Sequence, residues 1–212
     1  DVLTTVLTSG PEDQQGERQL LLNTMGLATV ALKMAACEDD DLCHGGLRLA
    51  MALLDGGNSE VQQAFLELLQ AGDAEHLVAA DGTEGSFLAK CKLRLIRGQK
   101  EIKERKIYLQ QQADRREDFD EMAVGLSAAA KEAMREDIER PYPSRAFVVD
   151  VLETLRLLCE GHHEPLQDFL RAQPSQIVTH DLVKEAYELL VALEARPRPL
   201  APHEPSRVSH FR

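Results

Sequence analysis

One short segment, Cys159-Glu160-Gly161-His162-His163, groups side chains that could bind a cation. Glu160 falls in the last turn of a predicted apolar helix, beside the negative end of the helix dipole and carbonyls without intrahelical partners. A carboxylate is unfavourable there unless a cation joins it, and calcium takes carboxylate and carbonyl oxygens together. The segment could therefore supply part of a calcium site, with Glu160 as ligand and His162 as a supporting residue. The residues alone favour the simpler interpretation, in which Glu160 reaches water or pairs with a neighbouring arginine and His162 is exposed.

Two groups of cysteines and histidines could each supply part of a zinc site. They are Cys37, Cys43 and His44, and Cys159, His162 and His163. Neither group has four ligands at zinc-finger spacing. Cys37 and Cys159 also fall on apolar helix faces, where a free cysteine usually packs as a small hydrophobe. We therefore favour buried thiols over structural zinc.

Two charged runs have simpler interpretations than ion or ligand binding. The acidic run 38–41 lacks the spaced oxygens of a calcium loop, and we expect Asp40 or Asp41 to cap the next helix. The basic stretch 90–106 is interrupted by Glu101 and Glu104 and has no aromatic residues for base stacking. We interpret it as a solvated helix face rather than a phosphate or calmodulin surface.

The sequence gives little support to an enzyme. It has no nucleophile elbow, phosphate loop, recognisable pair of catalytic carboxylates or Ser/His/Asp arrangement. Cys159 as a nucleophile with His162 as its base is the one catalytic hypothesis that we keep. We expect a protein that is not an enzyme.

Composition bounds the class of protein further. The 212 residues carry a formal net charge of -12, which opposes attraction to nucleic acid or anionic lipid. No apolar run approaches the roughly 20 residues of a membrane helix. The four cysteines have no disulfide-framework spacing, which favours reduced thiols in the cytosol. Because the sequence starts without Met, we expect it to be part of a longer protein.

Apolar periodicity predicts an all-α fold. Apolar residues recur at three- and four-residue steps, Trp is absent and aromatic residues make up 4%. The predicted helices cover 20–37, 42–54, 59–69, 86–114, 117–140, 148–160, 165–171 and 182–193, with a short helix near 74–80. The segment 86–114 is the long, charged helix of the fold.

Local signals predict how these helices begin, end and face the core. Gly56-Gly57 should end helix 42–54, because glycine takes the left-handed conformation without a side-chain clash. Ser59 with Gln62 forms a capping-box pattern, and Pro165 suits a first helical turn. The expected buried face of helix 20–37 is Leu21, Met25, Ala28, Leu32 and Ala35.

We divide the chain into four regions. Residues 1–17 are polar, and we interpret them as a linker or disordered leader. We interpret residues 18–140 as a helical segment with long charged helices. Residues 141–196 start a second helical domain. Residues 197–212 are polar and rich in proline, which predicts a disordered tail.

Three strings resemble the inositol trisphosphate receptor and ryanodine receptor family. Leu49-Ala50-Met51-Ala52-Leu53-Leu54-Asp55-Gly56-Gly57-Asn58, with Val61-Gln62 and Phe65, is similar to the family's "LA-x-ALLEGGN" turn and following helix. Residues 96–103 resemble its helix with a "QQEIK" string. Residues 155–173 resemble its "LQLLCENHN…LQNFLR-x-Q" segment, at the start of the region associated with the RIH domain.

The resemblance implies a tetrameric calcium-release channel of the endoplasmic reticulum. This part would lie in the cytosolic armadillo-like solenoid, a stack of helical pairs that couples ligand state to the pore. In the family, the Glu of "CENHN" helps bind the activating calcium, and it matches Glu160, while His162 matches the nearby histidine. Gly161 and His163 replace both asparagines. The family's second acidic ligand lies farther along the chain, in a segment that this sequence lacks.

Three hypotheses follow. The first is a cytosolic regulatory segment of a calcium-release channel, in which Glu160 contributes to an interdomain calcium site. Its partners would be the rest of the channel polypeptide and, through it, a homotetramer, with no nucleic acid and no membrane insertion by this segment. The second is a stand-alone helical interaction module related to these receptors and without an ion-binding role. The third is the Cys159/His162 enzyme.

Overall fold

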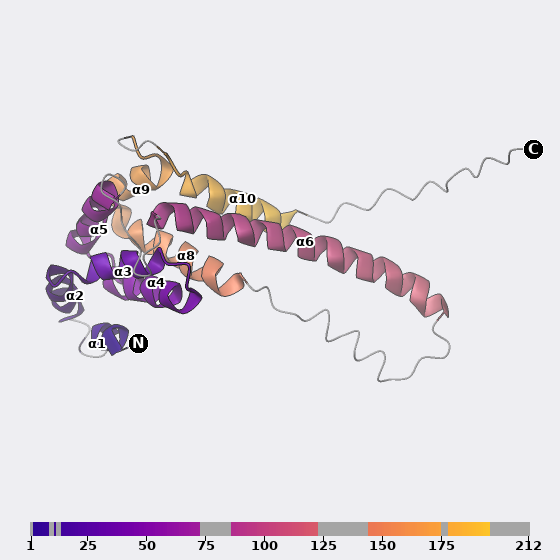
Figure 1. Cartoon of the computed structure of the whole chain (residues 1–212), viewed down its shortest axis with the longest axis horizontal. Coiled ribbons are helices and arrows are strands. Elements are labelled where there is room, and N and C mark those ends of the chain that lie inside the picture. The colour runs from indigo at the N-terminus through magenta and orange to yellow at the C-terminus, as the bar shows by residue number, and fades with distance from the viewer. Residues whose placement is uncertain are drawn as a thin grey trace, which may run out of the picture.

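The computed structural model describes residues 2–8, 11, 14–72, 86–122, 144–174 and 178–195. Within these residues the fold is helical and no strand occurs, so the predicted all-α class is confirmed (Figure 1). The helices are α1 Val2–Thr8, α2 Gln15–Thr24, α3 Leu27–Ala35, α4 Asp40–Leu54, α5 Ser59–Gly72, α6 Phe87–Met122, α8 Arg145–Leu158, η2 Glu160–His162, α9 Glu164–Arg171 and α10 Leu182–Glu194. The α6 helix, with 36 residues, corresponds to the predicted long charged helix 86–114, but it continues through the predicted break at 115–116 to Met122.

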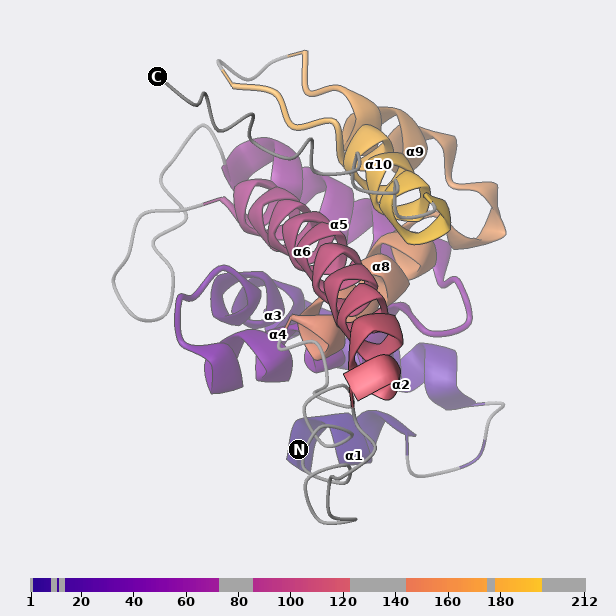
Figure 2. The ribbon, with the colours of Figure 1, turned by 90° about the vertical axis from the view of Figure 1, so that its right-hand side faces the viewer.

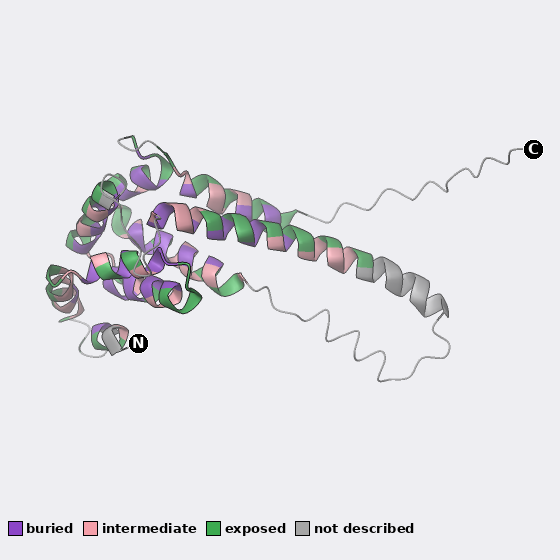
Figure 3. Cartoon of the chain, viewed as in Figure 1, coloured by how far each residue is buried: buried purple, intermediate pink, exposed green. Residues whose placement is uncertain are grey.

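The helices pack mainly in pairs around one core. The α3 and α4 helices form the most extensive pair, α10 runs along α6, and α8 packs against both α4 and α6 (Figures 1 and 2). The buried faces of these helices point toward one another, as Figure 3 shows by colour. Leu53, Phe65, Leu95 and Leu158 are fully buried there. The predicted apolar face of α8 is confirmed, because Val148, Val151, Leu155 and Leu158 are all buried.

The N-terminal region differs from the predicted linker over 1–17. Residues 2–8 form α1, which packs on α4, and Leu7 is fully buried. The α2 helix already begins at Gln15. A helix of seven residues is shorter than the window over which apolar periodicity can be recognised, so the sequence pattern did not predict it.

The single helix predicted for 20–37 is also wrong. It is divided into α2 and α3 by Gly26, whose φ of 85° is left-handed. Because the helix axis changes direction there, Leu21 and Met25 leave the predicted buried face and are 63% and 72% exposed. Ala28, Leu32 and Ala35 remain buried in α3.

The residues that cap the N-termini of α4 and α5 lie before the ones predicted from the sequence. Asp39 caps α4, because its side chain accepts from the Leu42 amide, and neither Asp40 nor Asp41 does so. The capping box at Ser59 is wrong as well, since Asn58 accepts from the amide of Glu60 at 3.2 Å. The predicted end at Gly56-Gly57 is confirmed, and both glycines have positive φ.

Several basic side chains of α6 bind neighbouring helices, contrary to the prediction of a solvated face. Lys106 Nζ donates to the carbonyls of Ala192, Leu193 and Ala195 at 2.6 to 2.8 Å, which caps the C-terminus of α10. Lys92 pairs with Glu185 of α10 at 3.7 Å. These contacts hold α10 along the first half of α6.

An aromatic stack joins α4, α6 and α8. The Arg94 guanidinium lies 4.0 Å from the centre of the Phe147 ring, and His44 stacks on Phe147 at 3.8 Å. His44 Nδ1 also lies 2.8 Å from the Asp150 carboxylate. Arg94 is 9% exposed and pairs with Asp40 at 3.6 Å. The buried Arg94 of α6 thus has partners from two other helices, Phe147 of α8 and Asp40 of α4.

Some predictions fall outside the described residues. The short helix near 74–80, the part of helix 117–140 beyond residue 122 and the tail 197–212 lie there. The proposed division into four regions stays a prediction.

Candidate functional site

The structure brings together two turns that are about a hundred residues apart in the sequence. One is the α4–α5 turn with Gly56 and Gly57, and the other is the turn η2 with Glu160 between α8 and α9. A side chain added at Gly57 would place its Cβ 3.3 Å from Glu160 Cγ. Two of the three strings that carry the family resemblance thus meet in one local unit, which we call the paired turns (residues 56–62 and 157–163).

Gln62 connects the paired turns through its side-chain amide. Its Nε2 lies 3.0 Å from the carbonyl oxygen of Leu157, 3.4 Å from that of Leu158 and 2.9 Å from that of Glu160. The side chain is 1% exposed. The sequence predicts carbonyls without partners at this helix end. The two hydrogens of the Gln62 amide can satisfy two of the three at a time, and the carbonyls of Leu157 and Glu160 are the nearer ones, which leaves them less available to a cation.

The two oxygens of the Glu160 carboxylate have different surroundings. Oε1 lies 3.5 Å from Nη1 of Arg156, so the pairing with a neighbouring arginine that the sequence allowed is present. Arg156 makes its shorter contacts, 2.8 and 3.0 Å, with Glu153. Oε2 is buried and has no hydrogen-bond partner among the described residues. A buried carboxylate oxygen without a donor is a position that a cation would stabilise.

The two histidines of this turn have different positions. His162 has a left-handed φ of 61° and is exposed. His163 instead caps α9, because its Nδ1 accepts from the Leu166 amide at 3.3 Å. Pro165 lies in the first turn of α9, as predicted. The role of His162 as a supporting residue stays a prediction.

The other candidate ligands take part in packing. Cys37 Sγ lies 3.3 Å from the Lys33 carbonyl oxygen, and Cys43 Sγ lies 3.3 Å from that of Ala35. His44 binds Asp150. Across the described part of the chain, no cluster of three or more His, Cys, Asp or Glu side chains could hold a metal ion. These residues therefore fit one ligand of a calcium site, Glu160, and not a complete site.

The buried thiols predict a loss of stability at alkaline pH. Burial raises the pKa of Cys43 from 9.0 to about 11, and it raises the pKa of Cys91 as well. A raised folded-state pKa gives stability that is complete below the unfolded pKa and is lost as pH rises through the folded one. For Cys43 we expect a free energy of unfolding about 2 kcal/mol lower at about pH 11 than at about pH 8.

Urea denaturation at both pH values would measure this loss. The variant Cys43→Ala should lose less free energy between the two pH values than the unsubstituted chain, because one titrating thiol is gone. An equal loss in both proteins would contradict the assignment to Cys43.

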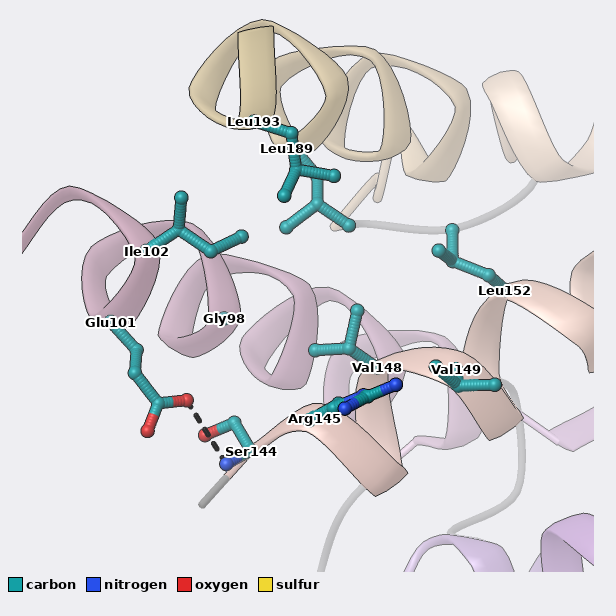
Figure 4. Close-up of a pocket in the computed structure, with 10 residues that line it drawn as sticks. All are labelled: Gly98, Glu101, Ile102, Ser144, Arg145, Val148, Val149, Leu152, Leu189 and Leu193. Carbon is teal, nitrogen blue, oxygen red and sulfur yellow. Dashed lines mark hydrogen bonds between the residues drawn. The ribbon is translucent and has the colours of Figure 1, made fainter. Parts of the chain in front are cut away.

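An apolar pocket lies between α6, α8 and α10, away from the paired turns (Figure 4). Its volume is about 320 Å³, and its lining residues are Gly98, Glu101, Ile102, Ser144, Arg145, Val148, Val149, Leu152, Leu189 and Leu193. Glu101 accepts from the Ser144 amide at 3.0 Å at one edge. The sequence analysis did not identify this pocket, because its walls come from three separate helices.

Comparison with protein families locates the resemblance. Residues 143–204 match the family described as "RyR and IP3R Homology associated". The matched range contains α8, the Glu160 turn, α9 and α10. In the described residues, no helix has both the length and the apolar character to cross a membrane. The family resemblance is thus confirmed over this range, which contains the string at 155–173, whereas the strings at 49–65 and 96–103 lie outside it. Through residues 143–204 the chain is similar to the family described by ryanodine receptor and inositol trisphosphate receptor homology.

Proposed function

We propose that this chain is a cytosolic regulatory segment of an intracellular ligand-gated calcium-release channel. It would act at the cytosolic face of the endoplasmic reticulum membrane, as part of a larger polypeptide that forms a homotetramer. It would couple ligand state to the pore without conducting ions itself. Glu160 would contribute one carboxylate to a calcium-sensing site completed by another part of the channel.

This proposal rests on the surroundings of the Glu160 carboxylate. Its Oε2 is buried without a hydrogen-bond donor among the described residues, within the range that matches the receptor family. Arg156, the cation nearest to Oε1, is shared with Glu153. One carboxylate is too few for tight calcium binding, which requires six to eight oxygen ligands. We therefore expect the 212-residue chain alone to bind calcium with a Kd of about 1 mM or weaker.

A calcium titration followed by NMR would test the role of Glu160. In the ¹⁵N-labelled chain, calcium should shift the Gly161 amide resonance, and Glu160→Gln should abolish that shift because the substitution removes the charge. Glu164→Gln is the matched control, since this exposed carboxylate lies four residues away. An unchanged titration in Glu160→Gln would refute the role of Glu160 in sensing calcium.

The same substitution has a stronger consequence in a channel polypeptide that contains this chain. There Glu160→Gln should raise the calcium concentration for half-maximal activation by about tenfold or more, because a metal site loses a charged ligand. Calcium-dependent channel opening would measure this, with Glu164→Gln again as the control.

A second function, a helical interaction module without ion chemistry, is favoured by the outer face of α10. Val183, Tyr187, Leu190 and Val191 are exposed there, and Tyr187 is 63% exposed. Their spacing of four, three and one residues forms an apolar stripe that is typical of helix–helix contacts. Calcium behaviour that does not change in Glu160→Gln would favour this function over the first.

A further inference from the structure

We propose that Gly57 and Gln62 are positioning residues for the Glu160 carboxylate. Both lie on the α4–α5 side of the paired turns, and Gln62 is 98 residues from Glu160 in the sequence. Their link to calcium rests on the proposed function, whereas their effect on the conformation of the Glu160 turn does not.

Gly57 provides the space in which the Glu160 side chain lies. Its φ of 69° is left-handed, and a Cβ at this position would lie 3.3 Å from Glu160 Cγ and 3.7 Å from Glu160 Cβ. Gly56 has a similar φ of 80°, but a Cβ there would meet nothing within 4 Å. The two adjacent glycines therefore share the same backbone requirement, but a Cβ would approach the candidate ligand only at Gly57.

Gln62 fixes the backbone that carries the carboxylate. Its bond to the Glu160 carbonyl, at 2.9 Å, sets the orientation of the peptide between Glu160 and Gly161. Gly161 and His162 then follow with left-handed φ values of 66° and 61°. A left-handed non-glycine residue such as His162 is held only where its surroundings enforce it. Because Gln62 is buried, its bonds to these carbonyls are stronger than the same bonds would be in water.

The same contacts give the site a connection to the N-terminal helices. Gly57 lies in the turn between α4 and α5, Gln62 lies in the first turn of α5, and α4 pairs with α3. A cation that moved the backbone of Glu160 would therefore act on α5, because the Gln62 side chain binds that backbone. The structure thus provides a local path from the carboxylate to α3, α4 and α5.

Two matched pairs of variants test the positioning role in calcium-free samples of the full 212-residue chain. Gly57→Ala is compared with Gly56→Ala, and Gln62→Met with Gln63→Met, since Gln63 is exposed and its side chain donates to Glu67 of the same helix at 3.0 Å. NMR records the amide resonances of Gly161 and His162 and their hydrogen exchange. Gly57→Ala and Gln62→Met should shift these resonances and speed their exchange, whereas Gly56→Ala and Gln63→Met should leave both unchanged.

The glycine pair separates positioning from general stability. Both alanine variants should lower the unfolding midpoint by similar amounts, because each places a side chain in the left-handed region. If both or neither of them altered the Gly161 and His162 amides, Gly57 would have no positioning role. If Gln62→Met does not fold, the glycine pair still decides the outcome.

A calcium titration of the same samples distinguishes this proposal from the proposed function. Gly57→Ala should raise the Kd for calcium, read at Gly161, by about tenfold, as is typical when a residue that orients a metal ligand is lost. Gly56→Ala should leave this Kd unchanged, and equal values for the two variants would overturn the link to calcium. If calcium did not shift the Gly161 amide resonance of the unsubstituted chain, the proposed function would be contradicted. The comparison of variants without calcium would still decide the positioning role.

Discussion

Gly46→Ala is expected to lower the free energy of unfolding by about 3 kcal/mol or more, because overpacking forces backbone elements apart. A Cβ at Gly46 would lie 2.3 Å from the backbone nitrogen of Ala35, 2.7 Å from the Ala31 oxygen and 2.8 Å from the Met34 carbonyl carbon. All three are backbone atoms of α3, so no side-chain rotation relieves the clash. The α3–α4 pair would have to separate.

The neighbouring glycine provides the control for this prediction. A Cβ at Gly45 would meet only Met34 Cε, at 3.1 Å, and this methyl group can move. Gly45→Ala should therefore be neutral or stabilise α4 by up to about 1 kcal/mol, the usual gain in helix propensity. Urea denaturation followed by circular dichroism measures both variants. Equal stabilities of the two would contradict close backbone packing between α3 and α4.

Phe147→Ala is expected to lower the free energy of unfolding by about 2 to 3 kcal/mol, slightly less than the loss of a fully buried phenylalanine. The ring lies between the Arg94 guanidinium and the His44 imidazole, so its removal takes an aromatic partner from both. Arg94 is nearly buried, and its Nε has no hydrogen-bond partner among the described residues. The variant therefore loses apolar contact and also weakens the environment of a buried charge.

A second variant separates the contribution of the aromatic ring to stability from that of side-chain volume. Phe147→Leu keeps most of the apolar volume but has no ring face, so it should lose only about 1 kcal/mol. Thermal or urea unfolding of both variants would test this. If Phe147→Leu were as stable as the unsubstituted chain, the stack would contribute packing alone.

Local sequence patterns predict some of the helix faces and helix ends but not others. The apolar face of α8, the glycine end of α4 and the proline start of α9 follow from local patterns, and all three are present. Gly26 is different, because a single glycine inside an apolar period is compatible with a continuous helix. Its left-handed conformation depends on how α2 and α3 pack on α4 and α5.

The candidate site was predictable only in part. The position of a glutamate at a helix end suggested a cation ligand. The alternative interpretation, a pair with a neighbouring arginine, corresponds to the contact of Glu160 with Arg156. Gln62 could not be assigned from local rules, which interpret it as half of a capping box with Ser59. Its partners are the carbonyls of residues 157, 158 and 160, more than ninety positions away. Long-range contacts of this kind leave no local pattern.

The length of α6 has a mechanical consequence. Lys106 caps the end of α10, so α6 continues beyond that contact to Met122 and extends past the other helices (Figure 1). These residues add about 24 Å at 1.5 Å per residue. A tilt of about 5° at the base would move the tip by about 2 Å, because displacement grows with distance from the base. Small rearrangements among α3, α8 and α10, which hold its base, are thereby amplified at a distance.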